Sequence, residues 1–212
     1  MRSAFPVTGA ILVGGTSSRM GRDKATLELG GVGLATRIAG VLRPFCDEVL
    51  LVGNQDVHVD GCRRVPDARS ERSSLTGLYT ALNEAASPLV LVVACDYPFV
   101  APRLLEILLS AWRAGLWSVI PLDSTGLHPL LALHHRNHVP RLEARLNQGR
   151  FRIAAALHPL RVATLPWSSL QRLGVSAECF WNLNTPTELL QATRQLEDID
   201  GNARSNGRGD RE

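Results

Sequence analysis

The chain has 212 residues, of which 45% are hydrophobic and 20% are charged. This length and composition suit one domain with a substantial core, and they exclude disorder over the body of the chain and collagen-like or coiled-coil architecture. A net charge of +3, 5% aromatic residues and scattered arginines argue against a nucleic-acid-binding protein and favour a small anionic ligand.

In the first half of the chain, apolar runs bounded by turn residues alternate with helical patterns. Strands are predicted at residues 7–13, 48–52, 63–65 and 89–95, and helices at 34–42, 75–86 and 102–112. The run from Leu89 to Cys95 is uninterrupted, which is typical of a central parallel strand covered on both faces.

The second half is less regular. Strands are predicted at 117–122, 130–133 and 161–165, a helix at 139–147, a short extended piece at 180–181 and a last helix at 186–196, capped by Thr185. Residues 197–212 are highly charged and almost free of apolar side chains, so a disordered tail is expected there. The predicted organisation is a single domain over residues 1–196.

Alternating strands and helices imply an α/β fold with a mostly parallel, doubly wound sheet. In such sheets, ligands bind beyond the carboxyl ends of the strands. The segments that follow Val13, Val52, Val65 and Cys95 are therefore the candidate site.

Glycines and cations follow the first strand. Gly14 and Gly15 expose backbone N–H groups that can face phosphate oxygens, and Arg19 and Lys24 add positive charge. The spacing matches neither a P-loop nor GxGxxG. The alternative is a solvated surface turn, but two cations at the end of a strand favour a phosphate site.

Carboxylates follow two other strands. Asp96 ends the most apolar run, where a carboxylate is costly unless it is paired or binds a metal, and Asp67 follows the strand at 63–65. Mg2+ takes one or two carboxylates together with substrate phosphates, which makes Asp96 the candidate metal ligand. A turn or capping role for Asp96 and an Asx turn for Asp67 are the alternatives.

Two other kinds of metal site are disfavoured. No CxxC pair occurs among the four cysteines, so neither paired zinc thiolates nor a disulfide scaffold is expected. His134, His135 and His138 lie at a strand-to-helix junction, where neighbouring side chains on the strand face opposite ways, so a shared metal site is not expected there.

The N-terminal residues lack the apolar stretch of a signal peptide, and no apolar segment is long enough to span a membrane. A cytoplasmic protein without a membrane partner is therefore expected.

The segment from Leu12 to Lys24, LVGGTSSRMGRDK, closely resembles the signature LAGGxSxRMGxDK of nucleotidyltransferases of the molybdenum cofactor guanylyltransferase type. Further motifs resemble those of that family and occur in its order: Asp67, SLTG at 74–77, CDYPF at 95–99 (like CDMPF), His128-Pro129, and NLNTPTEL at 182–189. The resemblance spans residue 8 to the end of the last predicted helix.

The resemblance implies a three-layer α/β/α, Rossmann-like fold of the nucleotide-diphospho-sugar transferase type. It implies a GTP-binding N-terminal part, a pterin-binding C-terminal part, and transfer of GMP from GTP to the phosphate of molybdopterin, with Mg2+ as cofactor and pyrophosphate as the other product. Further implied partners are other molybdenum-cofactor biosynthesis proteins and apo-molybdoenzymes or their chaperones. Such a reaction joins two phosphates, so it needs cations rather than a protein nucleophile.

The resemblance also implies a role for each matching residue. Nucleotide contacts are implied for Leu12, Val13, Gly14, Gly15, Lys24, Asp67 and Asp96; catalytic roles for Arg19, Lys24 and Asp96; Mg2+ binding for Asp96; and pterin contacts for His128, Asn182 and Asn184.

Some positions depart from the family pattern. Val13 replaces an alanine, Val52 stands where an asparagine is often found, and Ser73-Ser74 replace Gly-Pro, all of which bear on the choice of base. Gly14, where cytidylyltransferase relatives have alanine, favours guanine. The alternatives are a cytidylyltransferase or a sugar- or alcohol-phosphate nucleotidyltransferase of the same fold, and a non-catalytic nucleotide-binding adaptor.

Overall fold

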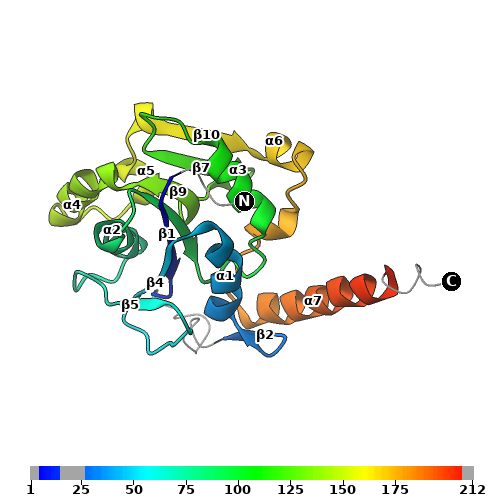
Figure 1. Ribbon diagram of the computed structural model, residues 1–212. Helices are drawn as coiled ribbons and strands as arrows, with labels where there is room; N and C mark the ends of the chain where they lie inside the picture. The colour runs from blue at the N-terminus through cyan, green and yellow to red at the C-terminus, as the bar shows by residue number, and fades with distance from the viewer. Residues whose placement is uncertain (1–4, 15–26, 207–212) are drawn as a thin grey trace.

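The structure is a computed structural model that describes residues 5–14 and 27–206, with side chains up to residue 196. A central sheet is flanked by helices on both faces, which confirms the predicted α/β fold (Figure 1). The helices are α1 (Leu34–Leu42), α2 (Ser74–Glu84), α3 (Pro102–Ala111), α4 (Val139–Asn147), α5 (Ile153–Ala156), α6 (Trp167–Arg172) and α7 (Pro186–Asn206). Short 3-10 helices cover Arg43–Phe45, Arg136–His138, Pro159–Arg161 and Ala177–Phe180.

The sheet is mostly parallel. Its strands, in spatial order, are β10 (Val162–Pro166), β7 (Ser118–Asp123), β9 (Leu131–His135), β6 (Leu89–Ala94), β1 (Val7–Leu12), β4 (Glu48–Val52) and β5 (Arg63–Val65). The neighbours β6, β1, β4 and β5 run parallel, whereas β9 is antiparallel to both β6 and β7. A short strand, β8 (Gly126–Leu127), forms a hairpin with β7.

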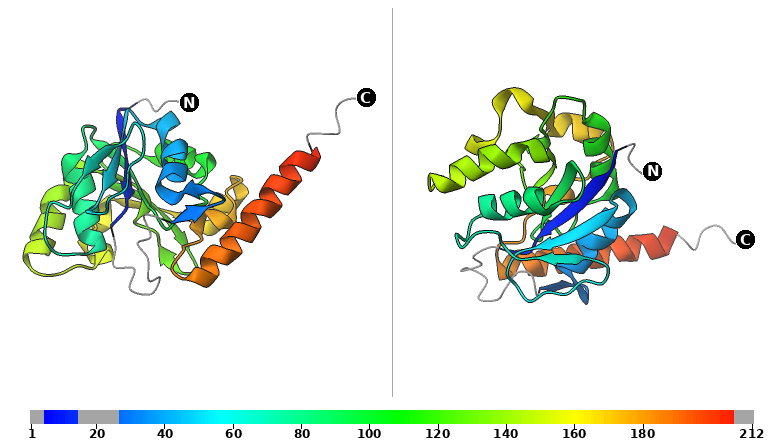
Figure 2. Two further views of the ribbon diagram at one scale, coloured as in Figure 1. Left: turned by 90° about the horizontal axis from the view of Figure 1, so that it is seen from below. Right: turned by 60° about the vertical axis from the view of Figure 1, so that its left-hand side comes forward.

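Two helical layers enclose this sheet. On one face α1 contacts α3, and on the other α2 contacts α4, so that the sheet lies between the two pairs (Figure 2). Every residue of β1 and of β6 is buried, as expected for strands covered on both faces.

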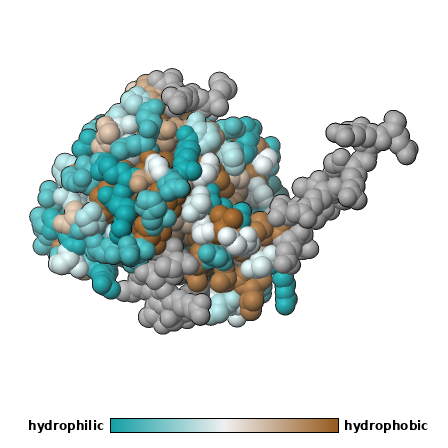
Figure 3. Space-filling model, turned by 60° about the horizontal axis from the view of Figure 1, so that its bottom comes forward, coloured by the Kyte–Doolittle hydropathy of each residue, from teal (hydrophilic) through white to brown (hydrophobic). Residues whose placement is uncertain are grey.

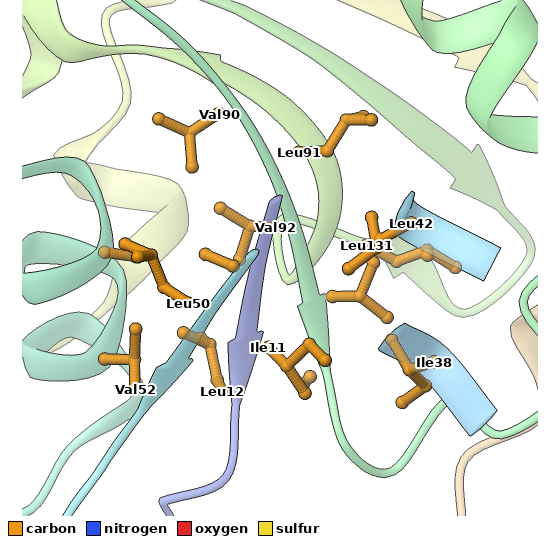
Figure 4. Packing of buried hydrophobic residues seen from close by; sticks show 14 of the residues in the cluster. Ile11, Leu12, Ile38, Leu42, Leu50, Val52, Val90, Leu91, Val92 and Leu131 are labelled. Atoms are coloured by element: carbon orange, nitrogen blue, oxygen red, sulfur yellow. The ribbon is translucent and has the colours of Figure 1, made fainter. Parts of the chain in front are cut away.

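The side chains of β1 alternate between the two halves of the core. Ile11 faces Ile38 and Leu42 of α1, whereas Leu12 lies on the side of Leu50 and Val52 (Figure 4). This alternation is the period of two that a strand imposes. It leaves the strand ends, rather than the strand faces, as the place where polar side chains can gather.

A second, smaller cluster attaches the base of α7 to the body. It joins Leu27, β2 (Glu28–Leu29) and α1 with Leu183 and Ala192. β2 pairs with β3 (Val32–Gly33) through Gly30 and Gly31, both with positive φ. Hydrophobic surface lies beside the base of α7 (Figure 3).

Two predictions near the C-terminus differ from the structure. Phe180, predicted to be extended, ends a 3-10 helix. α7 continues past the predicted end at Leu196 to Asn206 and projects from the body (Figures 1 and 2). The segment after Leu196 has no proline, and each residue added to an existing helix gains one hydrogen bond, so the helix does not stop where its apolar pattern stops.

No described helix is both long and apolar enough to cross a membrane.

Candidate active site

Four parallel strands end at one edge of the sheet, and the residues that follow them line a cavity of about 550 Å³. Main-chain hydrogen bonds continue past the strand ends: Cys95 N–H donates to the Leu12 carbonyl at 3.0 Å and Val13 N–H to the Val52 carbonyl at 2.9 Å. The loops after β1, β4 and β6 therefore start side by side. This is the edge at which doubly wound folds bind ligands.

Gly53 allows the β1 and β4 loops to approach each other. Its φ is +140°, and a Cβ atom there would lie 2.8 Å from the Gly14 nitrogen. Only glycine combines that conformation with so close a contact. A Cβ on Gly14, the glycine predicted for the site, would meet nothing closer than 3.7 Å. The close approach of the two loops therefore requires glycine more strictly at position 53 than at position 14.

Asp67 is held on the cavity wall by Asn54. The Asn54 Nδ2 donates to Asp67 Oδ2 at 3.3 Å, and the Asp67 amide donates to Asn54 Oδ1 at 3.1 Å. Burial raises the pKa of the Asp67 carboxyl, and the nearby Arg72 guanidinium partly opposes this shift. Asn54, Gln55 and Arg72 also line the cavity, although no sequence pattern singled them out.

The N-terminus of α2 forms another wall. Ser73 caps this helix, because its Oγ accepts a hydrogen bond from the Thr76 amide at 3.0 Å, and Ser73, Ser74 and Gly77 line the cavity. Exposed amides and the helix dipole make such an end attractive to anions. The end of α2 at the cavity is therefore a candidate site for an anion.

Asp96 and Asn184 lie together on the cavity wall although they are far apart in sequence. The Leu183 amide donates to the Asp96 carbonyl at 2.9 Å, which joins the segment before α7 to the end of β6. A capping box then starts α7: the Thr185 amide donates to Glu188 Oε2 at 2.8 Å, and the Glu188 amide donates to Thr185 Oγ1 at 3.2 Å. This confirms the predicted cap and places Asn184 beside the cavity.

His128 and Asn182 lie around Tyr97 instead. The His128 ring is buried, with Nδ1 3.1 Å from the Tyr97 hydroxyl and Nε2 3.1 Å from Asp123 Oδ1. Burial raises the pKa of Tyr97 to about 12. Of the three residues expected on the pterin side, only Asn184 lines the cavity.

The remaining predicted nucleotide residues divide into two groups. Leu12 and Gly14 line the cavity, whereas the Val13 side chain is part of the core and is 3% exposed. Gly15, Arg19 and Lys24 lie outside the described residues. Their roles stay predictions.

The cavity suits a hard metal ion. Asp67, Asp96 and Asn184, whose side chains carry oxygen atoms, are among the residues that line the cavity, and oxygen is the donor that Mg2+ prefers. Within the described residues, no group of three or more His, Cys, Asp or Glu side chains could hold a metal by itself. A site that completes its coordination with substrate phosphates matches this sparse donor set.

The histidines at the end of β9 have another explanation. Ser118 Oγ lies 2.7 Å from His134 Nδ1 and 2.9 Å from His138 Nε2, and all three residues are buried. Burial lowers the pKa of His134 to about 4 and, together with nearby positive charges, that of His138 to about 3. They form a neutral core network.

Comparison with known proteins gives relatives over most of the chain. Residues 9–162 match the family described as MobA-like NTP transferase domain. The chain is 33% identical over 192 residues to a probable molybdenum cofactor guanylyltransferase of Pelotomaculum thermopropionicum, covering 90% of this chain and 93% of that protein. It is 32% identical over 194 residues to the molybdenum cofactor guanylyltransferase of Desulfosudis oleivorans, covering 90% and 96%.

Comparison with solved structures gives a similar result. The molybdopterin-guanine dinucleotide biosynthesis protein A of Archaeoglobus fulgidus superposes with a TM-score of 0.78 at 27% identity, covering 90% of this chain and 99% of that one. A 2-C-methyl-D-erythritol 4-phosphate cytidylyltransferase of Thermus thermophilus, at TM-score 0.64 and 18% identity with 89% and 98% coverage, shares the fold.

Proposed function

The chain belongs to the family of MobA-like NTP transferases and is a nucleotidyltransferase, and from this premise we propose that it transfers GMP from GTP to the phosphate of molybdopterin. The products are the guanine dinucleotide form of the cofactor and pyrophosphate. One observation carries the proposal: Gly14, Asp67, Asp96, Asn184 and the N-terminus of α2 line one cavity at the carboxyl edge of the sheet. Relatives named for this activity match most of the chain.

The nucleotide would lie across the ends of β1, β4 and β6. The Ser73 end of α2 and the amide of Gly14 supply N–H groups for phosphate oxygens. Asp67, held by Asn54, is an acceptor for hydroxyl or N–H groups of the nucleoside. Arg19 and Lys24 are proposed to bind the triphosphate from the segment that follows Gly14.

Asp96 would hold Mg2+ together with the phosphates of the substrate. The ion, when bound, supplies positive charge that offsets the repulsion between the two phosphate groups. The pterin phosphate is itself the nucleophile, so the protein needs to align it rather than to form a covalent intermediate. Asn184, which lines the same cavity as Asp96, would orient this acceptor.

The test is turnover with defined substrates. Purified protein, Mg2+ and molybdopterin are incubated with GTP or with CTP, and pyrophosphate and the mass of the dinucleotide are measured. The proposal expects pyrophosphate and the GMP adduct with GTP, and neither without Mg2+.

Other results would assign a different function. Pyrophosphate release with CTP but not with GTP would identify a cytidylyltransferase. Pyrophosphate release with a sugar phosphate in place of molybdopterin would identify a different acceptor substrate. Stabilisation of the fold by GTP without any turnover would indicate a non-catalytic nucleotide-binding protein.

A further inference from the structure

The side chains of Asn54 and Asp67 form a reciprocal pair beyond the ends of β4 and β5. The Asp67 main-chain amide donates to Asn54 Oδ1 at 3.1 Å, and Asn54 Nδ2 donates to Asp67 Oδ2 at 3.3 Å. A main-chain amide can only donate, so the Asn54 oxygen has to face it and the Asn54 NH2 group has to face the carboxylate. The backbone of Asp67 therefore fixes the direction of both hydrogen bonds.

The backbone that carries Asp67 is itself held in place. The Ala68 amide donates to Thr80 Oγ1 at 3.0 Å, and the buried Thr80 hydroxyl donates to the Thr76 carbonyl in α2 at 2.9 Å. The segment after β5 is thus attached to α2 as well as to the loop after β4. A carboxylate held in this way keeps its orientation before a ligand arrives, which lowers the cost of binding.

One oxygen of Asp67 remains available for a ligand. Asn54 donates to Oδ2, whereas Oδ1 accepts no hydrogen bond from the described residues and is not one of their buried polar atoms that lack a partner. Asp67 lines the cavity, and the charge of Arg72 favours its ionised form by opposing the rise in pKa that burial causes. An ionised carboxylate has about four lone-pair sites on its two oxygens, so it can accept from two adjacent N–H groups of one ligand.

The position of Asp67 indicates which part of a nucleotide it meets. In the parallel block β6-β1-β4-β5, Asp96 follows the strand at one end and Asp67 follows the strand at the other. Three strand spacings, roughly 14 Å, separate those two strands. A carboxylate repels phosphate, and in a nucleotide whose phosphates and metal lie at Asp96 the base is the most distant part. Guanine carries two adjacent donors on one edge, its N1–H and its 2-amino group.

We propose that Asp67 recognises the guanine base by accepting hydrogen bonds from its N1–H and 2-amino groups, and that Asn54 is a positioning residue that holds the carboxylate for this contact. The inference rests on the proposed function, because it needs a guanine nucleotide in the cavity. Asn54 acts through Asp67 and determines which atoms of residue 67 face the base.

Nucleotide affinity tests the contact directly. Binding of GTP, ITP and XTP to the full chain in the presence of Mg2+ is measured by calorimetry. ITP lacks the 2-amino group, so the parent protein should bind it roughly tenfold more weakly than GTP, the value of one hydrogen bond to a charged group. XTP has a carbonyl oxygen at the same position, which would face the carboxylate as acceptor against acceptor, so its affinity should be lower still.

Asp67→Asn should reverse the preference between GTP and XTP. Asn54 Nδ2 still needs an acceptor, so the new amide should turn its oxygen to Asn54 and its NH2 group to the base, where it donates to the C2 carbonyl of xanthine. The affinity for GTP should fall roughly tenfold, and the affinity for XTP should rise above that for GTP. A general loosening of the fold would lower both affinities and produce no such gain.

A second substitution tests the role of Asn54. In an Asn54→Ala background, Asp67→Asn should give little preference for XTP, because nothing then orients the new amide. Asn83→Ala is the matched control. Asn83 Nδ2 also donates to a carboxylate, that of Glu84 at 3.0 Å, but Asn83 does not line the cavity, so all nucleotide affinities should stay those of the parent protein. An XTP gain of the same size without Asn54 would overturn the positioning role.

Other results would overturn the contact with guanine. Equal affinities for GTP and ITP in the parent protein would do so, as would a loss of GTP binding in Asp67→Asn without any gain for XTP. Weaker binding of 2′-deoxyGTP together with equal binding of GTP and ITP would assign the carboxylate to the ribose instead.

These outcomes are distinguishable from failure of the proposed function. A protein that binds GTP more tightly than ITP but releases no pyrophosphate with molybdopterin would refute the transfer and support the guanine contact. Pyrophosphate release at the same KM for GTP and ITP would refute the contact and support the transfer. Absence of GTP binding would refute both.

Discussion

At the scale of single residues, Asp96 has the most demanding role. Asp96→Asn keeps the shape of the side chain and removes its charge, so metal binding should fail and kcat should fall by at least about a hundredfold. Pyrophosphate release measures the rate, and circular dichroism verifies the fold. Asp60→Asn, at a fully exposed carboxylate, is the control. A rate near that of the parent enzyme in Asp96→Asn would refute the metal role.

A second prediction concerns the effect of a Gly53 substitution on stability. Gly53→Ala combines a φ of +140° with a Cβ 2.8 Å from the Gly14 nitrogen, and should lower the free energy of unfolding by about 2 kcal/mol or more. Urea denaturation measures this loss. Gly126→Ala has a similar φ of +121° but open space around its Cβ, so it should cost less. Equal losses would show that the contact between the β1 and β4 loops is unimportant.

Sequence alone predicted those site residues that follow a strand or precede a helix. Gly14, Asp67 and Asp96 follow parallel strands, so elementary geometry brings them to one edge, whereas Asn184 was expected only from the family resemblance. The contact between Tyr97 and His128 could not be predicted. Tyr97 and His128 are 31 positions apart and meet only because β7, β8 and β9 fold back beside β6, which no local pattern encodes.

At the scale of elements, α1 offers a simple test of helix energetics. Gly40 lies on the exposed side of this helix, and nothing lies within 4 Å of the position its Cβ would take. Gly40→Ala should therefore stabilise the protein by about 0.5–1 kcal/mol, because alanine loses less backbone entropy in a helix. Urea denaturation should show a higher midpoint with unchanged turnover. A lower midpoint would mean that the α1 surface has a partner.

Periodicity predicted most of the strands and helices but missed several of the shortest elements. The bounds of α1, β4, β5 and α4 are confirmed at every residue. The β2–β3 hairpin was missed because each strand has only two residues, although Gly30-Gly31 is the glycine pair that such a tight turn favours. The helices α5 and α6 are too short for a hydrophobic period to be visible.

At the scale of the whole molecule, stability should depend on pH through the buried histidines. The pKa values of His134 and His138 are lowered to about 4 and about 3. Above the ordinary value of 6.5 both rings are neutral whether the chain is folded or unfolded. Below it only the unfolded chain takes up protons, so stability is lost as pH falls from 6.5 towards 4, by up to about 1.4 kcal/mol per pH unit and histidine.

Urea denaturation between pH 7 and pH 5 checks this dependence. The window lies above the range in which Glu48 and Asp123, whose pKa values are lowered, begin to titrate. His138→Gln should flatten the profile, whereas His58→Gln, at a histidine whose side chain is 77% exposed, should not. A constant unfolding midpoint across the window in the parent protein would contradict the account of the Ser118 network.

The sheet topology shows where prediction from sequence ends. The parallel block of β6, β1, β4 and β5 follows from apolar strands that alternate with helices. The antiparallel insertion of β9 between β6 and β7 does not, since it depends on pairing between strands distant in the chain. That insertion brings the Leu130 carbonyl to the Ala94 amide at 2.8 Å, and so shapes the edge that carries Asp96.

A crystal structure of the protein with GTP and Mg2+ tests the central claim most directly. We expect the triphosphate between the loop at Gly14, the N-terminus of α2 and Asp96, with the metal on the Asp96 carboxylate. Nucleotide bound at any other surface, or metal bound away from Asp96 while GTP fills the cavity, would contradict this account.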